Sequence, residues 1–279
     1  MQRVVCEGAP RDLGLDQGRG CREAVRAEAR ALGWPLDGGW LGALRAARGA
    51  PRPSRALARD LARHFPHLDE RLSGLAAGAG LPREALLVLL EEQLDDAPVH
   101  GVGLARDAHG APRVVVLHAT PPPTGLLLRT ARPDGGYPNL ALTRPGLVAA
   151  LAGVNERGLA GAVELLDAPA PQRAGAGGCA AASALLLDQC LERLDTVEKA
   201  LEWCERRPGG GHARIVFADA GGAVGALELQ DDARRRCAPR TVTADEAARA
   251  VLHLDPAARA LEWRAPDGAV EREALEAGG

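Results

Sequence analysis

The stretch VHGVGLARDAHGAPRVVVLH, residues 99–118, decides the fold class of this 279-residue chain. Residues 99–106 alternate between apolar and other residues, and residues 113–118 are rich in β-branched valine, so both segments are predicted to be strands. The four residues between them, Asp107-Ala108-His109-Gly110, have the composition of a turn. The two strands should therefore form a hairpin, which favours antiparallel sheets over a doubly wound parallel sheet.

Helical patterns dominate the residues before this hairpin, and strands alternate with helices after it. Apolar residues recur at helical spacing in the segments 11–32, 55–65, 68–79 and 82–93. Beyond the hairpin we expect strands at 126–130, 140–143, 147–153, 159–166, 215–219, 223–230 and 260–264, and helices at 180–193, 196–206 and 245–252. The pattern predicts a single α+β domain over residues 1–279, with a mostly helical N-terminal segment, 1–98, and a body of sheets flanked by helices, 99–279.

Composition and charge exclude several classes of function. The formal net charge is -3, which gives no basic field for nucleic acid, and the run Arg234-Arg235-Arg236 after two aspartates is interpreted as a solvated turn. The N-terminal residues lack the apolar core of a signal peptide, and no apolar stretch approaches the ~18 residues of a membrane span. We therefore expect a cytoplasmic protein with neither nucleic acid nor membrane as a partner.

The cysteines and the familiar enzyme motifs give no sign of a metal or cofactor. Six cysteines stand at positions 6, 21, 179, 190, 204 and 237, without a CxxC pair or a zinc-like His/Cys spacing. We interpret them as free thiols in a reducing compartment. The chain also lacks a GxSxG elbow, a phosphate-binding loop, an HExxH motif and a dinucleotide-binding glycine loop after a strand. No cofactor and no metal are expected.

Several short phrases follow one another in a defined order along residues 5–230. They are Glu7 to Gly14 with Gln17-Gly18, Leu75 to Leu81, Glu91-Glu92, Thr143 to Leu147, Gly153 to Leu159, Thr196 to Leu201, and Phe217 to Gly222. In this order they resemble the isopenicillin-N acyltransferase-like family of N-terminal nucleophile (Ntn) hydrolases. The resemblance implies an αββα sandwich of antiparallel sheets flanked by helices. It also implies acyltransferase or amide-hydrolase chemistry on a small acylated or peptide-like molecule.

The same resemblance implies a catalytic cysteine that this chain does not have. In the family that cysteine follows a glycine, is released by self-cleavage, and uses its own α-amino group as general base. Here the Gly-Cys pair reads Gly101-Val102, and valine has no nucleophilic atom. An Asn-x-Asp motif reads His118-Ala119-Thr120, and a later asparagine reads Glu164. These changes predict a degenerate homologue that does not process itself but keeps a pocket for its ligand.

The residues that we expect to line this pocket, and the alternatives to that role, follow from the same segments. Asn155 also fits a simple turn asparagine, and Glu164 alternates with apolar neighbours on a strand, either in the pocket or in solvent. Cys179 stands at an expected helix start, where the helix dipole lowers a thiol pKa, so it is either a relocated nucleophile or a packed thiol. The candidates are Val102, His118, Thr120, Asn155, Glu164, Cys179 and His212.

Three functions remain open at this level. The first is a binding protein derived from an Ntn acyltransferase or amidohydrolase, and the second is an active acyltransferase or amide hydrolase with a rebuilt nucleophile. The third is a scaffold or oligomerisation protein whose role does not involve the pocket. Pocket shape determines which ligand is bound, and a linear sequence does not encode it in a readable pattern. The sequence also leaves open whether the chain forms a homo-oligomer.

Overall fold

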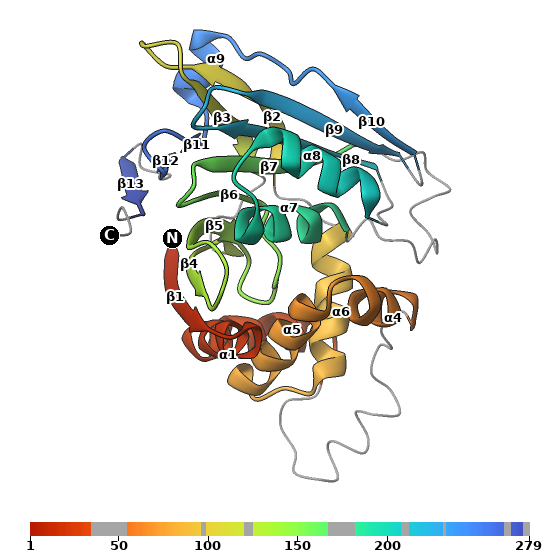
Figure 1. Ribbon diagram of the computed structural model, residues 1–279. Coiled ribbons are helices and arrows are strands. Elements are labelled where there is room, and N and C mark those ends of the chain that lie inside the picture. The colour runs from red at the N-terminus through yellow and green to blue at the C-terminus, as the bar shows by residue number, and fades with distance from the viewer. Residues whose placement is uncertain are drawn as a thin grey trace, which may run out of the picture.

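The computed structural model describes residues 1–34, 55–95, 99–119, 125–166, 182–207, 212–230, 233–264 and 269–275. Within these ranges the chain forms two β-sheets and eight helices (Figure 1). The α+β class expected from the sequence is therefore confirmed. The core is built mainly from alanine, leucine and valine, because the whole chain contains only two phenylalanines, one tyrosine and four tryptophans.

The larger sheet has eight strands, and nearly all of its neighbouring strands are antiparallel. The exception is β1, which pairs with β4 in parallel from Gln2 opposite Leu127 to Gly8 opposite Pro133. The strand order is β1 (Gln2–Gly8), β4 (Leu127–Pro133), β5 (Asn139–Thr143), β6 (Ala152–Asn155), β7 (Leu159–Leu165), β8 (His212–Asp219), β9 (Val224–Gln230) and β10 (Ala233–Cys237).

The smaller sheet contains the hairpin from which the fold class was predicted. Its strand order is β13 (Val270–Ala274), β12 (Ala260–Arg264), β11 (Leu252–Asp255), β3 (Pro112–Ala119) and β2 (Val99–Arg106), and all pairs are antiparallel. Val102 on β2 lies opposite Val116 on β3, and both side chains are fully buried in the main core. Val115, on the alternate face of β3, belongs to a second, smaller apolar cluster. The hairpin prediction is confirmed.

The two sheets pack face to face, and helices lie on their outer faces. Strands β2 and β3 contact β7 and β8 across the interface, and α9 (Ala244–Arg249) contacts β3. The helices α7 (Ala182–Arg193) and α8 (Val197–Arg206) cover the opposite face of the larger sheet, as Figure 1 shows. Leu187 of α7 packs at Gly161 of β7, and Leu201 of α8 packs at Gly225 of β9.

The N-terminal helices form a separate layer beside β1 and β4. They are α1 (Pro10–Gly20), α2 (Arg22–Ala31), α4 (Arg55–His64), α5 (Pro66–Ala79) and α6 (Arg83–Asp95). Helices α1 and α5 are in very close contact at four glycines, Gly14 and Gly18 of α1 and Gly74 and Gly78 of α5. A Cβ atom at Gly14 would lie 1.9 Å from the carbonyl oxygen of Arg71, and one at Gly74 would lie 1.9 Å from that of Arg11. Only glycine permits this approach, which explains the glycines of the first sequence phrase.

Three sequence predictions are wrong or incomplete in this half of the molecule. The helix expected over 11–32 is divided at Cys21, whose φ of -114° and ψ of 17° are not helical. The sequence analysis also did not predict β1. The strand expected over 147–153 is wrong for residues 147–151, because β6 begins only at Ala152. Carbonyl groups of this segment accept hydrogen bonds from side chains instead, with Leu147 bonded to Gln17 and Ala149 to Thr143.

The C-terminal third contains further differences from the expectation. The three arginines interpreted as a solvated turn form β10, and Arg235 pairs with Glu228 of β9. Acidic partners on β9 and α8 hold Arg235 and Arg236, so a charged run serves as an edge strand here. The helix expected over 245–252 ends at Arg249, and Leu252 already belongs to β11. Strands β11 and β13 were not predicted.

No single helix within the described ranges is long and apolar enough to cross a membrane. One bent pair, Pro66–Ala79 with Arg83–Gln93, passes the test of length and composition when its two helices are taken together, and the bend between them is 114°.

Candidate functional site

Four charged side chains lie in register across the last four strands of the larger sheet. Glu164 of β7 stands opposite Arg214 of β8, which stands opposite Glu228 of β9, which in turn stands opposite Arg235 of β10. Arg214 donates to Glu164 Oε2 at 3.4 Å through Nη1 and to Glu228 Oε1 at 2.6 Å through Nη2. Arg235 Nη2 donates to Glu228 Oε2 at 2.5 Å. These four residues, here named the charged row, alternate in sign along the whole series.

The charged row faces the smaller sheet rather than the helices. Directly opposed residues share one face of a sheet, so the four side chains lie together. On that face the backbone N–H of Gly101 on β2 donates to Glu164 Oε1 at 2.8 Å. The side chain of Glu164 is 14% exposed and that of Arg235 is 74% exposed, so the row extends from the edge of the inter-sheet core to solvent.

Mutual hydrogen bonds shift the pKa values within the charged row. Hydrogen bonds from Arg214 and then Arg235 hold the pKa of Glu228 below its ordinary value. The hydrogen bond to Glu228, followed by the charge of Glu164, raises the pKa of Arg214. Glu228, Arg214 and Arg235 therefore keep their charges at neutral pH. Arg214 Nε is buried and has no nitrogen or oxygen acceptor within the part of the chain that the structure describes.

A thiol lies beside the charged row. Cys237 is two residues beyond Arg235 on β10, which places both on the same face of the strand, and its side chain is half-buried. Burial and then the charge of Glu228 raise the pKa of the Cys237 thiol, and the charges of Arg214 and Arg235 only partly oppose this. The thiol is therefore protonated at neutral pH, which is the opposite of the condition that activates a cysteine nucleophile.

Several of the candidate pocket residues lie at the end of the two sheets where Gly101 contacts Glu164. Val102 follows Gly101, whose amide is bonded to Glu164, and the Val102 side chain is fully buried. His212 is two residues before Arg214 on β8 and lies on the same face, and its carbonyl accepts from the backbone N–H of Leu166. The backbone of His118 pairs with His100, two residues along β3 from Val116. The side chain of His118 lies outside the described part of the structure.

Other candidates lie elsewhere or cannot be placed. Asn155 lies at the turn between β6 and β7, at the opposite end of β7 from Glu164. Its amide donates to the carbonyls of Leu191 and Leu194, and its Oδ1 accepts from Arg157 and Leu159. Those bonds tie the turn to the end of α7, so the structure does not bring Asn155 to Glu164. Thr120 and Cys179 lie outside the described residues.

The sequence analysis identified Glu164 but not its partners in the charged row. Arg214 stands between Ala213 and Ile215, and Glu228 stands between Leu227 and Leu229. A single charge in an otherwise apolar strand is a usable signal, because it must find a partner when it is buried. Arg235 was missed for another reason, since the arginine run was interpreted as a turn. Within one sequence, the register that aligns the four charges is not visible.

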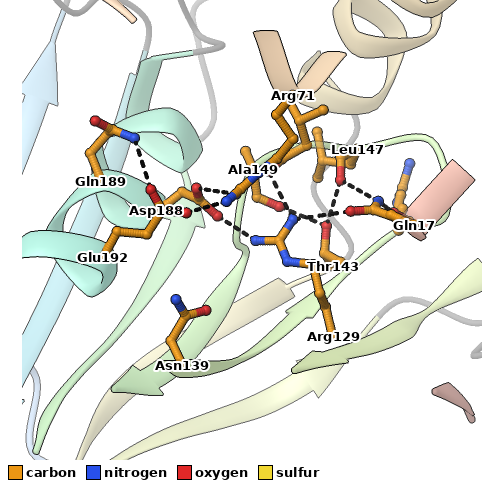
Figure 2. A network of polar contacts seen from close by, with 12 residues as sticks. Gln17, Arg71, Arg129, Asn139, Thr143, Leu147, Ala149, Asp188, Gln189 and Glu192 are labelled. Atoms are coloured by element: carbon orange, nitrogen blue, oxygen red, sulfur yellow. Dashed lines mark hydrogen bonds and ion pairs between the residues drawn. The ribbon is translucent and has the colours of Figure 1, made fainter. Parts of the chain in front are cut away.

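A second charged cluster lies on the helix side of the larger sheet. Arg71 of α5 pairs with Asp188 and Glu192 of α7, and Arg129 of β4 also pairs with Asp188 (Figure 2). Arg129 Nη1 donates at 3.2 Å to Gln17 Oε1 on α1 and at 2.9 Å to the carbonyl of Val148. We name this set the buried network; it comprises Gln17, Arg71, Arg129, Asp188 and Glu192, and each of these residues is less than 9% exposed.

The buried network is closed rather than accessible. Two arginines face two carboxylates, so the formal charges cancel within the cluster. Burial acts to lower the pKa of Arg71, but Glu192 and Asp188 more than compensate, and the Arg71 pKa lies above its ordinary value. Gln17 donates in addition to the carbonyls of Pro145 and Leu147, which fixes the loop before β6. This cluster connects the N-terminal helices to the body and has the properties of a structural element.

No group of three or more His, Cys, Asp or Glu side chains within the described ranges is placed to hold a metal ion.

Comparisons with known proteins give little further information. No protein-family model matches the chain, and no curated protein matches it. Among solved structures, the chain is similar to penicillin V acylase from Agrobacterium tumefaciens, with 23% identity and a TM-score of 0.28. The match covers 39% of this chain and 38% of the acylase, so the chain spans well under half the length of that protein. A similarity of this extent assigns neither a family nor an activity.

Proposed function

We propose that this chain is a degenerate Ntn-type acyltransferase or amidohydrolase homologue that remains a single chain and binds a small acylated or peptide-like molecule without hydrolysing it. One observation carries the proposal. At the position where the family resemblance requires a nucleophile, the chain has Val102, fully buried, and the preceding amide is bonded to the carboxylate of Glu164. That end of the sheets has groups that can bind a ligand, but Val102 supplies no atom that can attack one.

The order of the layers supports the fold that this proposal assumes. Helices α7 and α8, the larger sheet, the smaller sheet and α9 follow one another as the layers of an αββα sandwich would. The N-terminal helices and this body share one apolar core, which fits a single domain over residues 1–279. The proposal also includes membership of an Ntn-like family, an αββα architecture and a cytoplasmic location.

The chemistry of the charged row supports the loss of hydrolysis. Amide hydrolysis needs a nucleophile and donors that stabilise a developing oxyanion. The thiol beside the row, Cys237, is protonated at neutral pH, and Glu164 stands where the family resemblance places an asparagine. A carboxylate at that position repels an oxyanion, whereas an asparagine amide would donate to it.

The same groups suit an amide as ligand. A peptide-like molecule presents an N–H donor beside a C=O acceptor. Glu164 offers a carboxylate acceptor, and the buried Arg214 Nε offers a donor that has no nitrogen or oxygen acceptor within the described residues. A carbonyl oxygen that reached the Arg214 guanidinium would accept a charge-assisted hydrogen bond there. Acylated amino acids and short acylated peptides combine this amide with an apolar chain.

The experiment is a thermal-shift screen of N-acyl amino acids and short acyl-peptides, coupled to chromatography that detects amide cleavage. A ligand that binds only the folded state at ~100 times its dissociation constant stabilises by ~2.7 kcal/mol, so a hit should raise Tm by several degrees. We expect the shift to be lost in Arg214→Gln and Glu164→Gln.

Arg236→Gln is the matched control, because Arg236 lies in the same sheet, on β10, but faces Glu198 and Glu205 of α8 on the other side of that sheet. The ligand should still raise the Tm of this variant. Cleavage of the amide by the wild-type protein would overturn the proposal in favour of an enzyme with a rebuilt nucleophile. A shift that persists in both charged-row variants would place the ligand elsewhere.

A further inference from the structure

Two cysteines on neighbouring helices touch in the core. Cys190 lies on α7 and Cys204 lies on α8, and both side chains are fully buried. Their sulfur atoms are 3.6 Å apart, close enough for one thiol to donate to the other. The sulfur of Cys190 also lies 4.0 Å from the carbonyl oxygen of Ala200. Thiols in contact on two separate helices are positioned for a covalent bond between the helices.

The geometry requires only a small approach of the two sulfur atoms. A disulfide has an S–S length of about 2.05 Å, so the observed 3.6 Å must shorten by about 1.6 Å. Cysteine side chains change rotamer about χ1, and a rotation of either side chain moves its sulfur atom. The connection between the helices is short, because α7 ends at Arg193 and α8 begins at Val197. The short connection keeps the two helices, and with them the two thiols, near each other.

We propose that Cys190 and Cys204 form a disulfide that cross-links α7 to α8 when the protein encounters a small-molecule disulfide such as oxidised glutathione. One cysteine thiolate attacks a sulfur of oxidised glutathione, forms a mixed disulfide and releases one glutathione thiolate. The second cysteine thiolate attacks the protein sulfur of that mixed disulfide and releases the second glutathione. The two cysteines lose two protons and two electrons, and one oxidised glutathione becomes two reduced molecules.

Burial determines when this exchange takes place. Burial and the neighbouring Cys204 raise the pKa of the Cys190 thiol, so very little thiolate exists in the closed fold. Exchange therefore needs opening of the α7–α8 contact or takes place while the chain folds. The same burial excludes reductants once the bond has formed. We expect a cross-link that forms slowly in the native protein, quickly during folding, and resists later reduction.

The consequence of the cross-link is a firmer support for the strands of the charged row. Helix α8 packs on β9 through Leu201, and Glu198 and Glu205 of α8 hold Arg236 on β10. Helix α7 carries Asp188 and Glu192 of the buried network. A covalent bond between the helices would thus connect the supports of both charged clusters. This inference does not depend on the proposed ligand.

The test is a peptide map of the full chain after refolding. The protein is unfolded in guanidinium chloride, refolded into a mixture of oxidised and reduced glutathione, alkylated, and digested with trypsin without reduction. Cleavage after Arg173, Arg193, Lys199 and Arg206 places Cys190 and Cys204 in separate peptides. We expect these two peptides to be joined, with a mass about 2 Da below the sum of the Cys204 peptide and the Cys190 peptide alkylated at Cys179, because two hydrogens are lost. Cys179 lies in the same peptide as Cys190, so fragmentation of the joined peptides is used to place the bridge, which we expect on Cys190.

Variants and stability complete the experiment. Cys237→Ala is the matched control and should leave the cross-link unchanged, because Cys237 lies on the opposite face of the larger sheet, whereas Cys204→Ala should abolish it. The oxidised wild-type protein should melt about 5 °C higher than the reduced one, because the bond closes a loop of about 15 residues. The proposal is overturned if natively refolded wild-type protein yields both peptides separately and alkylated. It is also overturned if Cys190 is joined to another cysteine.

Discussion

The buried network and the charged row are built from the same chemistry, with two arginines and two carboxylates each, yet they differ in where they lie. In the buried network Arg71 and Arg129 are fully enclosed with Asp188. In the charged row, exposure rises to 74% at Arg235. Enclosed pairs cannot exchange partners without leaving a charge unpaired in the interior, whereas exposed pairs can exchange with water or ligand. The comparison separates an enclosed element that holds the fold from one that extends into solvent at Arg235.

The two clusters also join different parts of the chain. The buried network connects Gln17 and Arg71, which precede residue 98, to Arg129, Asp188 and Glu192, which follow it. Every residue of the charged row lies after residue 102, on four consecutive strands of one sheet. The Ntn-type ancestry that we propose would imply an ancestral cleavage point near residue 101. The buried network therefore lies where two separated segments would have to be held together.

The largest expected effect is the loss of one charge from the buried network. Arg71→Met leaves Asp188 and Glu192 with one buried arginine between them, so we expect a loss of about 3–5 kcal/mol in the free energy of unfolding. The double variant Arg71→Met/Glu192→Met removes one charge of each sign and leaves Arg129 with Asp188. It should therefore be more stable than the single variant. Denaturant unfolding measures both, and equal or lower stability of the double variant would contradict the pairing.

A smaller effect is expected from the charged row. Glu228→Gln keeps the size of the side chain but removes the charge that holds Arg214 and Arg235. Hydrogen bonds to charged groups are worth more than neutral ones, but solvent screens Arg235, so we expect a loss of about 1 kcal/mol. Arg236→Gln, on the neighbouring strand β10, is the control for a partly exposed ion pair on the other face of the sheet. A loss for Glu228→Gln as large as that for Arg71→Met would remove the distinction between the two clusters.

Acid titration sharpens the same comparison. The folded-state pKa of Glu228 lies below its ordinary value of 4.5, because Arg214 and Arg235 bond its charged form. The unfolded chain therefore binds the proton first, and the stabilisation is present above pH ~4.5 and lost as the pH falls through the folded-state pKa. The difference in unfolding free energy between wild type and Glu228→Gln should therefore shrink between pH 6 and pH 3. A constant difference over this range would show that the charge of Glu228 does not cause it.

The sequence predicted the elements whose patterns are local. The hairpin of β2 and β3 followed from alternation and turn residues, and α8 followed from its apolar spacing. Strand β10 was not predicted because it carries three successive arginines. Only the acidic side chains on the neighbouring strand and helix show why arginines suit that edge of the sheet. The prediction of a strand over 147–153 was wrong for its first residues, because the side chains of Gln17 and Thr143 donate hydrogen bonds to carbonyls of that segment.

The site could be predicted only in part, for a related reason. Val102 and Glu164 were identified as neighbours through a family resemblance, and the bond from Gly101 to Glu164 joins their strands. Arg214 and Glu228 were not identified, because the strands that carry them are brought into register by the sheet rather than by their spacing in the chain. Arg71 and Asp188, which are 117 residues apart in sequence, are paired only by the tertiary fold.

The smallest expected effect concerns the missing nucleophile. Val102→Cys supplies an attacking atom, but self-cleavage also needs a base and donors for the oxyanion, each donor typically worth ~2.7–4 kcal/mol. With Glu164 in place of an amide donor, we expect no self-cleavage and no amide turnover from this variant. The triple variant Val102→Cys/Thr120→Asp/Glu164→Asn should do better than the single one. Self-cleavage of Val102→Cys within hours, seen as two bands on a denaturing gel, would show that the site was never dismantled.

The most direct test of the central claim is the intact mass of the wild-type protein under denaturing conditions, after prolonged incubation of the folded protein at neutral pH. Because Val102 cannot attack the preceding carbonyl, the account predicts one species of 29.0 kDa. Two fragments that meet between Gly101 and Val102, held together before denaturation by contacts such as the buried network, would contradict it.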